Sequence, residues 1–99
     1  MGEKLGADPH KLSDIFSVST GRCWSVDTYN PLPGYLPGVP ASNNYEGGFM
    51  IRLVMKDLSL AIEAAQSVGA VSEETQRAYD MYARINELGY GDRDFGIVY

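Results

Sequence analysis

The chain has 99 residues with a formal net charge of −5, and 44% of its residues are hydrophobic, which suffices for one small domain with a marginal core. The negative charge and the absence of a Lys/Arg cluster argue against nucleic acid as a partner, because nucleic-acid binding depends on neutralising phosphates. No apolar run approaches the length of a membrane span, so we expect no membrane partner, and the single cysteine, Cys23, allows no intrachain disulfide and favours a reducing compartment.

The residues before Gly6 have the pattern of a helix end that stops at this glycine. A helix this short is not stable alone, so we expect that the chain was cut upstream and that Met1 need not be the biological start. Asp8 followed by Pro9 is a strong helix-start signal, with the aspartate as N-cap and the proline at the first helical position. The helix that follows is expected to bury an apolar stripe formed by Leu12, Ile15, Phe16 and Val18.

A second, shorter helix is expected over residues 21–29, where Ser19 or Thr20 can act as the cap. It would carry Arg22, Cys23, Trp24, Asp27 and Tyr29. Four of the five prolines then fall between residues 30 and 48, so no regular element is expected there. A loop of this length inside a domain is usually functional or disordered, and its aromatic and aliphatic residues favour a loop that packs on a surface.

Residues 47–65 are expected to form the central helix, because no glycine or proline interrupts the segment after Gly48 until Gly69. Helical spacing places one broad apolar face on Phe49, Met50, Leu53, Val54, Leu60, Ala61, Ala64 and Val68. Asp57 falls inside that face, where a carboxylate must be paired, hydrogen-bonded or turned to a polar cleft; Arg22 or Arg77 could pair with it. Lys56 lies at the edge of the same face.

Gly69 is expected to end the central helix, and Ser72 opens another helix with two acidic residues in its first turn. One face of this helix carries Ala78, Tyr82, Ile85 and Leu88, and Gly89 stops it. Asp92 is then expected to cap a last turn that contains Phe95. Since no alternating run demands a strand, the sequence predicts an all-α fold, a compact helical domain of about four to five helices.

The sequence has no motif for nucleotide binding and none for a catalytic triad. The sequence contains neither G-x-G-x-x-G nor G-x-x-x-x-G-K-[ST], so the chain has no dinucleotide cradle of its own. The one histidine, His10, is interpreted as a solvated surface residue, and we expect no metal site. A core position accounts for Trp24 about as well as a functional position does. Lys56 fits a surface lysine whose aliphatic stem covers apolar surface. Asp57 is the residue that a purely structural role fits least.

Three segments carry more specific motifs. They are Ser-Thr-Gly-Arg-Cys-Trp-Ser-Val-Asp-Thr-Tyr-Asn-Pro at 19–31, Val-Pro-Ala-Ser-Asn-Asn-Tyr-Glu-Gly-Gly-Phe at 39–49, and Met-Lys-Asp-Leu-Ser-Leu-Ala at 55–61. Together they resemble the C-terminal domain of 3-hydroxyisobutyrate dehydrogenases, and the likeness covers nearly the whole chain. The Lys-Asp-Leu-x-Leu-Ala signature alone is typical of the wider β-hydroxyacid dehydrogenase family, whereas the Gly-Arg-Cys-Trp segment and the Pro/Gly loop select the hydroxyisobutyrate branch.

The resemblance implies a parent enzyme that uses NAD to oxidise 3-hydroxyisobutyrate to methylmalonate semialdehyde in valine catabolism. The family's catalytic lysine lies on a helix upstream of Met1, so no catalytic residue is expected in this chain, and the isolated chain should be inactive and should not bind NAD. Lys56 matches the family lysine that reaches the cofactor. Trp24, Phe49 and Asp57 match residues on the substrate side of the cleft.

Residues 1–99 would then be the helical C-terminal domain, which supplies the cofactor lid, a cleft wall and dimer contacts. Its expected partners are the missing N-terminal Rossmann domain, a small hydroxy acid and a second copy of the chain in a homo-oligomer. The compartment would be the cytoplasm of a bacterium or the mitochondrial matrix of a eukaryote. Two alternatives stay open: a reductase of the same fold for another small β-hydroxy acid, of the tartronate semialdehyde type, and a stand-alone helical dimerisation module.

Overall fold

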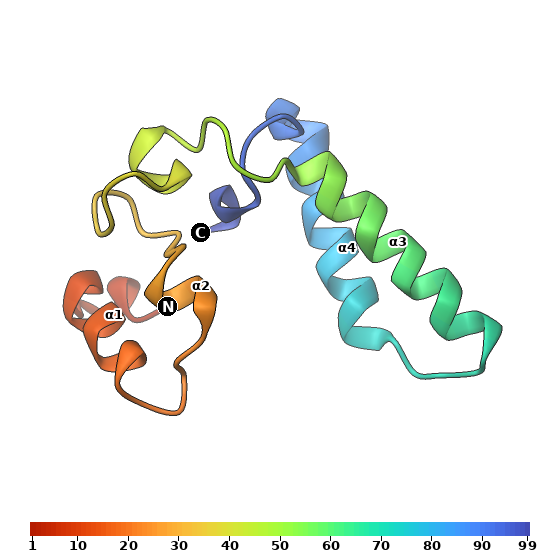
Figure 1. The fold of residues 1–99 in the computed structure, drawn as a ribbon, viewed down its shortest axis with the longest axis horizontal. Coiled ribbons are helices and arrows are strands. Elements are labelled where there is room, and N and C mark those ends of the chain that lie inside the picture. Colours follow the sequence, from red (N-terminus) through yellow and green to blue (C-terminus); the bar gives the residue numbers. More distant parts are fainter.

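The computed structural model describes residues 1–99 and consists of helices and loops (Figure 1). The only β-type pairing is an isolated antiparallel bridge between Met50 and Asp94, so the all-α prediction is confirmed. The four α-helices are α1 (Pro9–Ser17), α2 (Trp24–Asp27), α3 (Ile51–Ser67) and α4 (Glu73–Ile85). Short 3-10 helices occupy Glu3–Leu5 (η1), Pro40–Asn43 (η2) and Phe95–Val98 (η4), and a π-helical turn occupies Asn86–Tyr90 (η3).

The molecule has two parts: α3 and α4 pack on each other as a long hairpin, and this hairpin projects from a lobe that holds α1, α2 and both termini (Figure 1). The radius of gyration is 15.1 Å, whereas a compact chain of this length has one of about 13 Å. Only eight of the 99 residues are buried. The domain is therefore more extended than the compact shape we expected, and it leaves apolar side chains uncovered.

The start of α1 follows the prediction, because the Asp8 carboxylate accepts hydrogen bonds from the backbone amides of His10 and Lys11. The expected buried stripe of α1 is wrong. Ile15 and Phe16 are 56% and 46% exposed, and the one buried residue of the helix is Ser13. The apolar side of this helix around Ile15 and Phe16 is therefore largely open to solvent.

The helix expected over residues 21–29 is only four residues long, from Trp24 to Asp27. Neither Ser19 nor Thr20 caps it; its N-cap is Cys23, which contributes no side-chain hydrogen bond. The long loop that follows contains one short element, η2, and is fastened to α1 by the Tyr35 hydroxyl, which donates to Asp14 over 2.7 Å. The expectation of a loop that packs on a surface is thus correct.

The central helix begins at Ile51 rather than at residue 47, because Gly47 and Gly48 have φ values of 80° and 66° that no right-handed helix contains. Phe49 and Met50 therefore lie before the helix, with Met50 as its N-cap. The other end is as predicted. Gly69 takes a left-handed φ of 68°, and the amide that follows it, that of Ala70, donates back to the carbonyl of Ala65.

The apolar face predicted for the central helix is not the face that packs. The side of α3 toward α4 carries Ile51 and Ile62, both buried, and Ile62 lies beside Tyr79 of α4. On the predicted face Leu60 is 55% exposed, and Leu53 is also exposed. The helix is apolar on two sides, and only one of them has a partner in this chain.

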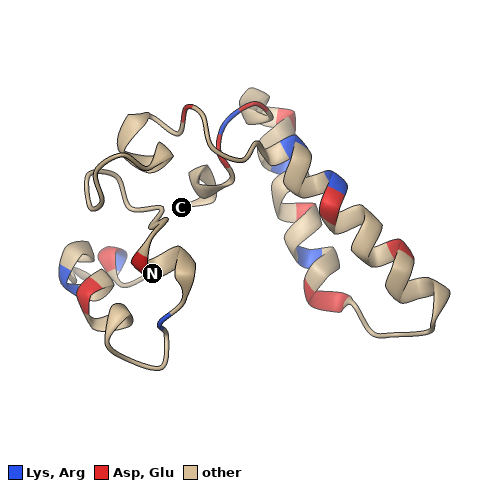
Figure 2. Cartoon of the chain, in the orientation of Figure 1, with Lys and Arg blue, Asp and Glu red and all other residues tan.

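The second helix of the hairpin, α4, begins after Ser72 and carries Glu73 and Glu74 in its first turn, as expected, although the Ser72 side chain makes no capping bond. Its regular part ends at Ile85, and the π-helical turn η3 carries the chain on past Gly89, whose φ is 91°. Lys and Arg residues lie in both parts of the molecule, with Asp and Glu residues among them (Figure 2). None of the helices combines the length and apolar character that crossing a membrane demands.

The C-terminal turn η4 is capped by Asp94, so the predicted cap, Asp92, is wrong. Asp92 instead accepts a salt bridge from Arg52, whose Nε lies 2.7 Å away. The reason is that residues 91–93 run along the start of α3, where the backbone amides of Ile51 and Arg52 donate to the carbonyls of Arg93 and Gly91. This pairing turns Asp92 outward and Asp94 inward, toward the lobe.

Candidate functional site

Three aromatic rings from two distant segments form a continuous stack. The rings of Trp24 and Tyr29 are 5.2 Å apart at an interplanar angle of 19°, and those of Tyr29 and Phe95 are 5.7 Å apart at 6°. Trp24 lies at the outer end and is 62% exposed, which excludes its interpretation as a core residue. An exposed tryptophan on a rigid aromatic support presents a large apolar surface with little conformational freedom left to lose.

The carboxylate of Asp94 lies at the centre of this region and is only 1% exposed. Its Oδ2 accepts a hydrogen bond from the Tyr29 hydroxyl at 2.7 Å and another from the Phe49 amide at 2.9 Å. Its Oδ1 accepts one from the Gly96 amide at 2.9 Å. A buried carboxylate is stable only with such donors, so these three bonds define its geometry.

Burial, together with the hydrogen bond to the Asp94 carboxylate, raises the pKa of Tyr29 to about 12. The hydroxyl therefore remains protonated throughout the neutral range and keeps donating to Asp94. The negative charge of Asp94 acts in the same direction on its other aromatic neighbours: burial and then this charge raise the pKa of Tyr45 and of Tyr82. One buried carboxylate thus sets the electrostatic environment at the junction of lobe and hairpin.

The segment that leads to Phe49, residues 44–48, is called the arch here. Its residues Asn44 and Tyr45 have positive φ values of 51° and 57°, which are uncommon for residues other than glycine. Arg93 holds it, since one guanidinium nitrogen donates to the Asn44 carbonyl at 3.1 Å and to the Glu46 carboxylate at 2.8 Å. Such strain persists only where the surroundings determine the conformation, and it is often found at functional sites.

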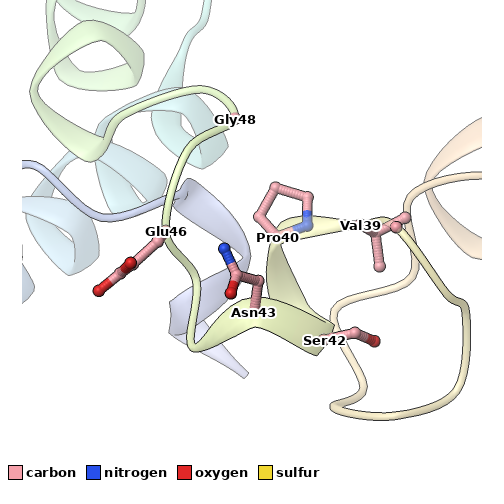
Figure 3. A pocket seen from close by; sticks show the side chains of 7 residues that line it. Val39, Pro40, Ser42, Asn43, Glu46 and Gly48 are labelled. Carbon is pink, nitrogen blue, oxygen red and sulfur yellow. The ribbon is translucent and has the colours of Figure 1, made fainter.

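A cavity of about 370 Å³ opens beside the arch (Figure 3). Its polar side chains are those of Ser42, Asn43 and Glu46, and Glu46 is already paired with Arg93. None of the four site residues expected from the sequence lines this cavity.

Lys56 and Asp57 lie on α3, away from the aromatic stack, and their side chains hydrogen-bond to each other. They are 59% and 53% exposed, so Asp57 is not the buried carboxylate that its place on an apolar face suggested. Neither expected arginine pairs with it: Arg22 binds Asp27 at 2.7 Å, and Arg77 forms no ion pair. No hydrogen bond joins the Lys56–Asp57 pair to Trp24 or Phe49.

The helix N-termini of the chain do not suit the pyrophosphate of a dinucleotide. The first amides of α3 are bonded to the carbonyls of Gly91 and Arg93, the first amides of α1 face the Asp8 carboxylate, and α4 starts with two glutamates. The one group predicted for the cofactor that can reach a ligand from this chain is the exposed ammonium of Lys56. No group of three or more histidine, cysteine or acidic side chains is placed to hold a metal ion.

The predicted site residues include Trp24 and Phe49 but not Asp94, whose carboxylate connects their two segments. The available signal was an aspartate two residues before Gly96, which is the spacing of an N-cap at a short turn. That signal predicts the bond to the Gly96 amide alone. The bonds to Tyr29 and Phe49 span 65 and 45 residues, and no local pattern indicates them.

The whole chain, residues 1–99, matches the family described as NAD-binding of NADP-dependent 3-hydroxyisobutyrate dehydrogenase. It is 44% identical to the mitochondrial 3-hydroxyisobutyrate dehydrogenases of Bos taurus and Homo sapiens, over 100% of this chain and 30% of theirs. Among solved structures, that of Mycobacterium tuberculosis 3-hydroxyisobutyrate dehydrogenase with L-serine superposes with a TM-score of 0.90 at 39% identity, covering 98% of this chain and 33% of that one.

The helical fold and these matches define the chain as a C-terminal NAD-binding domain of a dehydrogenase. The chain spans about 30% of the length of the curated relatives it matches. It belongs to the 3-hydroxyisobutyrate dehydrogenase family. The resemblance on which the site residues were expected is therefore confirmed at the level of the family.

Proposed function

We propose that this chain forms one side of the active site of an enzyme that uses NAD to oxidise 3-hydroxyisobutyrate to methylmalonate semialdehyde in valine degradation. The observation that carries the proposal is the family match over the entire chain. Membership alone does not separate this activity from that of a same-fold reductase of the tartronate semialdehyde type. The Gly-Arg-Cys-Trp segment favours the hydroxyisobutyrate branch, and in this chain it supplies the exposed end of the aromatic stack.

Trp24, Phe49 and Asp57 are proposed to line the substrate side of the cleft. Both aromatic side chains are exposed, at 62% and 40%. The Phe49 backbone amide binds the Asp94 carboxylate, and Trp24 stacks on Tyr29, whose hydroxyl binds the same carboxylate, so the two rings offer apolar surface in a fixed position. Asp57 reaches solvent from the side of α3 that nothing in this chain covers. When the remainder of the enzyme closes over these residues, they would exclude water from the reacting carbon.

Lys56 is proposed to contact the nicotinamide cofactor, which accepts a hydride from the hydroxy acid when it is bound. Its ammonium is exposed and its one ionic partner is the adjacent Asp57, so it can turn to a ligand without leaving a buried carboxylate unpaired. The proton transfer and the pyrophosphate cradle must come from another part of the enzyme. Nothing in the helix N-termini of this chain replaces a glycine-rich phosphate loop.

We further propose that the chain takes part in a homo-oligomer. In the isolated 99-residue chain, where no other part of the enzyme covers it, the uncovered side of α3 would be the surface through which copies associate. Leu53 and Leu60 are exposed on this side, together with small residues at positions 61 and 64 that allow a close approach. Contiguous apolar surface of this kind rarely stays in water, and symmetric dimers are the commonest way to bury it. The other proposed partner is the Rossmann domain of the enzyme. The proposed cofactor is NAD, not NADP.

The experiment that tests the function is steady-state kinetics of the full-length enzyme with 3-hydroxyisobutyrate and, in the reverse direction, with methylmalonate semialdehyde and tartronate semialdehyde. We expect kcat/KM to favour the hydroxyisobutyrate pair and NAD over NADP. A preference for tartronate semialdehyde would assign the chain to the alternative reductase. A coding region without a dinucleotide-binding segment upstream would instead favour the stand-alone dimerisation module.

A further inference from the structure

The two exposed aromatic residues of the proposed cleft wall come from separate segments, and the structure connects them through one atom. Phe49 donates its backbone amide to Oδ2 of Asp94, and Trp24 stacks on Tyr29, whose hydroxyl donates to the same Oδ2. Two further contacts join these segments: Tyr29 also stacks on Phe95, whose amide donates to the Phe49 carbonyl, and the Tyr45 hydroxyl donates to the Pro31 carbonyl. Oδ2 of Asp94 is the one atom that Tyr29 and Phe49 both bind directly, so it is the most direct connection between the two aromatic residues.

Asp94 is itself held firmly from both sides along the backbone. Its amide donates to the Tyr45 carbonyl at 2.9 Å, and the amide of Phe95 donates to the Phe49 carbonyl at 2.9 Å. The amide of Ile51 donates to the Arg93 carbonyl at 3.0 Å. These bonds leave the 1% exposed carboxylate little freedom to move, so it acts as a fixed reference point for the groups that bind it.

Trp24, in contrast, depends on its neighbours for its position. Helix α2 has only four residues and no side-chain cap, and a helix of that length does not hold itself in water. Its C-terminal end is fixed by Asn30, whose amide nitrogen donates to the Val26 carbonyl. The ring of Trp24 has one packing partner among the aromatic residues, which is Tyr29.

We propose that Asp94 is a positioning residue of the substrate cleft: through Oδ2 it holds Tyr29, and thereby Trp24, at a fixed place relative to Phe49, and so shapes the wall that a small hydroxy acid contacts. The inference rests on the proposed function, since it takes Trp24 and Phe49 to be cleft residues. Asp94 does not touch the substrate in this scheme. It acts only through the two donors that share its oxygen.

The test uses the full-length enzyme and two variants that remove the shared contact from opposite ends, Tyr29→Phe and Asp94→Asn. Tyr29→Phe is the milder change, because the ring and its stack remain while the hydroxyl is lost, so it keeps the test decisive if Asp94→Asn fails to fold. The matched control is Tyr35→Phe, which removes another tyrosine hydroxyl that donates to a carboxylate, that of Asp14 at 2.7 Å, outside the contacts around Asp94. Trp24→Ala measures whether the ring matters for the substrate at all.

Two readouts separate positioning from plain stability. We expect Tyr29→Phe to raise the KM for the hydroxy acid on the order of tenfold with a smaller change in kcat, because a misplaced cleft wall weakens substrate binding first. We also expect it to change the near-ultraviolet circular dichroism of Trp24, the only tryptophan in this chain, measured in the 99-residue chain. Tyr35→Phe should leave both readouts at their wild-type values.

The outcomes distinguish the two levels of the argument. If Trp24→Ala raises KM but Tyr29→Phe matches wild type in KM and in the Trp24 signal, the positioning role of Asp94 is wrong while the cleft role of Trp24 stands. If Tyr35→Phe changes KM as much as Tyr29→Phe does, the effect is one of general stability and the proposal is overturned as well. If Trp24→Ala leaves KM unchanged, the proposed cleft role is wrong and the inference built on it falls with it.

Discussion

The carboxylate of Asp94 and the backbone amide of Phe49 form a hydrogen bond of 2.9 Å across 45 residues of sequence. The bond fixes the chain where the arch enters α3, at the junction of the hairpin and the lobe. Because the acceptor is a buried charge whose same oxygen also binds the Tyr29 hydroxyl, this bond contributes more to stability than one between neutral groups. The stability of the junction should therefore depend on a few backbone positions around it.

The first prediction concerns Gly48, the residue before Phe49. A Cβ atom at this position would collide with the Asp94 carboxylate, the Tyr29 hydroxyl and Pro40, and the φ of 66° is already unfavourable for other residues. Gly48→Ala should lower the free energy of unfolding by more than about 3 kcal/mol, measured by urea denaturation.

Gly47→Ala is the matched control for this change. Its φ of 80° carries a similar backbone penalty, but nothing lies within 4 Å of the added Cβ. It should cost only about 1–2 kcal/mol. Equal losses for the two variants would mean that backbone conformation alone, and not the space around Asp94, requires glycine at position 48.

What the sequence predicted well is local. The Asp8–Pro9 helix start, the glycine that ends α3 and the helical class all follow from signals within a few residues, and the structure has each of them. The central helix begins at Ile51 and not at the predicted residue 47, because Gly47 and Gly48 are not helical. Their positive φ values follow from the contacts of the arch with Arg93 and Asp94, which lie far along the chain.

The burial pattern was the part that the sequence could not predict. Periodicity found a true apolar face around Leu53 and Leu60, but burial depends on which surface meets a partner, and α4 meets the other side through Ile51 and Ile62. The same limit explains the exposed stripe of α1 around Phe16. A helix that is apolar on two sides indicates at least two neighbours, and the sequence does not say that one of them lies outside the chain.

The second prediction concerns pH. The pKa of Tyr29 is raised from an ordinary 10.0 to about 12, so the folded state favours the protonated hydroxyl. The stabilisation from this group is fully present below pH 10.0 and is lost as pH rises through about 12, because the unfolded tyrosine ionises first. The difference in free energy of unfolding between wild type and Tyr29→Phe should therefore shrink across that window.

Alkaline difference spectrophotometry gives an independent check. The titration curve of wild type minus that of Tyr29→Phe should show one tyrosine that ionises near pH 12. A difference curve centred at the ordinary pKa of 10.0 would show that the Tyr29 hydroxyl is not held against Asp94 in solution.

The third prediction is that the 99-residue chain alone does not bind a nicotinamide cofactor usefully. The first amides of α3 are bonded to backbone carbonyls, those of α1 are bonded to the Asp8 carboxylate, and α4 begins with acidic side chains. The pyrophosphate of the cofactor therefore finds no suitable backbone donors at these helix starts. Isothermal titration calorimetry with NAD and with NADP should show no binding tighter than about 1 mM. Micromolar binding to either one would contradict the assignment of the cradle to another part of the enzyme.

The fourth prediction is that the chain self-associates through the uncovered side of α3. Leu60 is 55% exposed there, and Leu60→Glu should shift the chain toward monomer in sedimentation equilibrium, because a charge cannot be buried in an apolar contact without a partner. Val18→Glu serves as the control. Val18 is 86% exposed, but it lies at the end of α1, in the lobe and not in the hairpin that contains α3. A wild-type chain that stays monomeric at high concentration would rule out this surface as an oligomer contact.

The last prediction concerns Lys56 in the full-length enzyme. As an exposed surface lysine paired only with Asp57, it would contribute no more than about 0.5 kcal/mol to stability, and its replacement would leave turnover alone. As a ligand of the cofactor it would make a charge-assisted contact of about 1.5–3 kcal/mol. Lys56→Ala should then lower kcat/KM by roughly ten- to a hundredfold with little change in melting temperature.

Two companion variants make the Lys56 result specific. Arg77→Ala removes an exposed cation of α4 that has no ion pair, and it should leave the kinetics unchanged. Asp57→Ala separates the roles within the pair: loss of activity at constant stability places both residues at the ligand, whereas loss of both would indicate a structural ion pair. Since the Lys56–Asp57 contact is exposed, screening by water and salt keeps its own contribution small, so a large kinetic effect must arise at the cofactor. Wild-type kinetics of Lys56→Ala would leave α3 as scaffold.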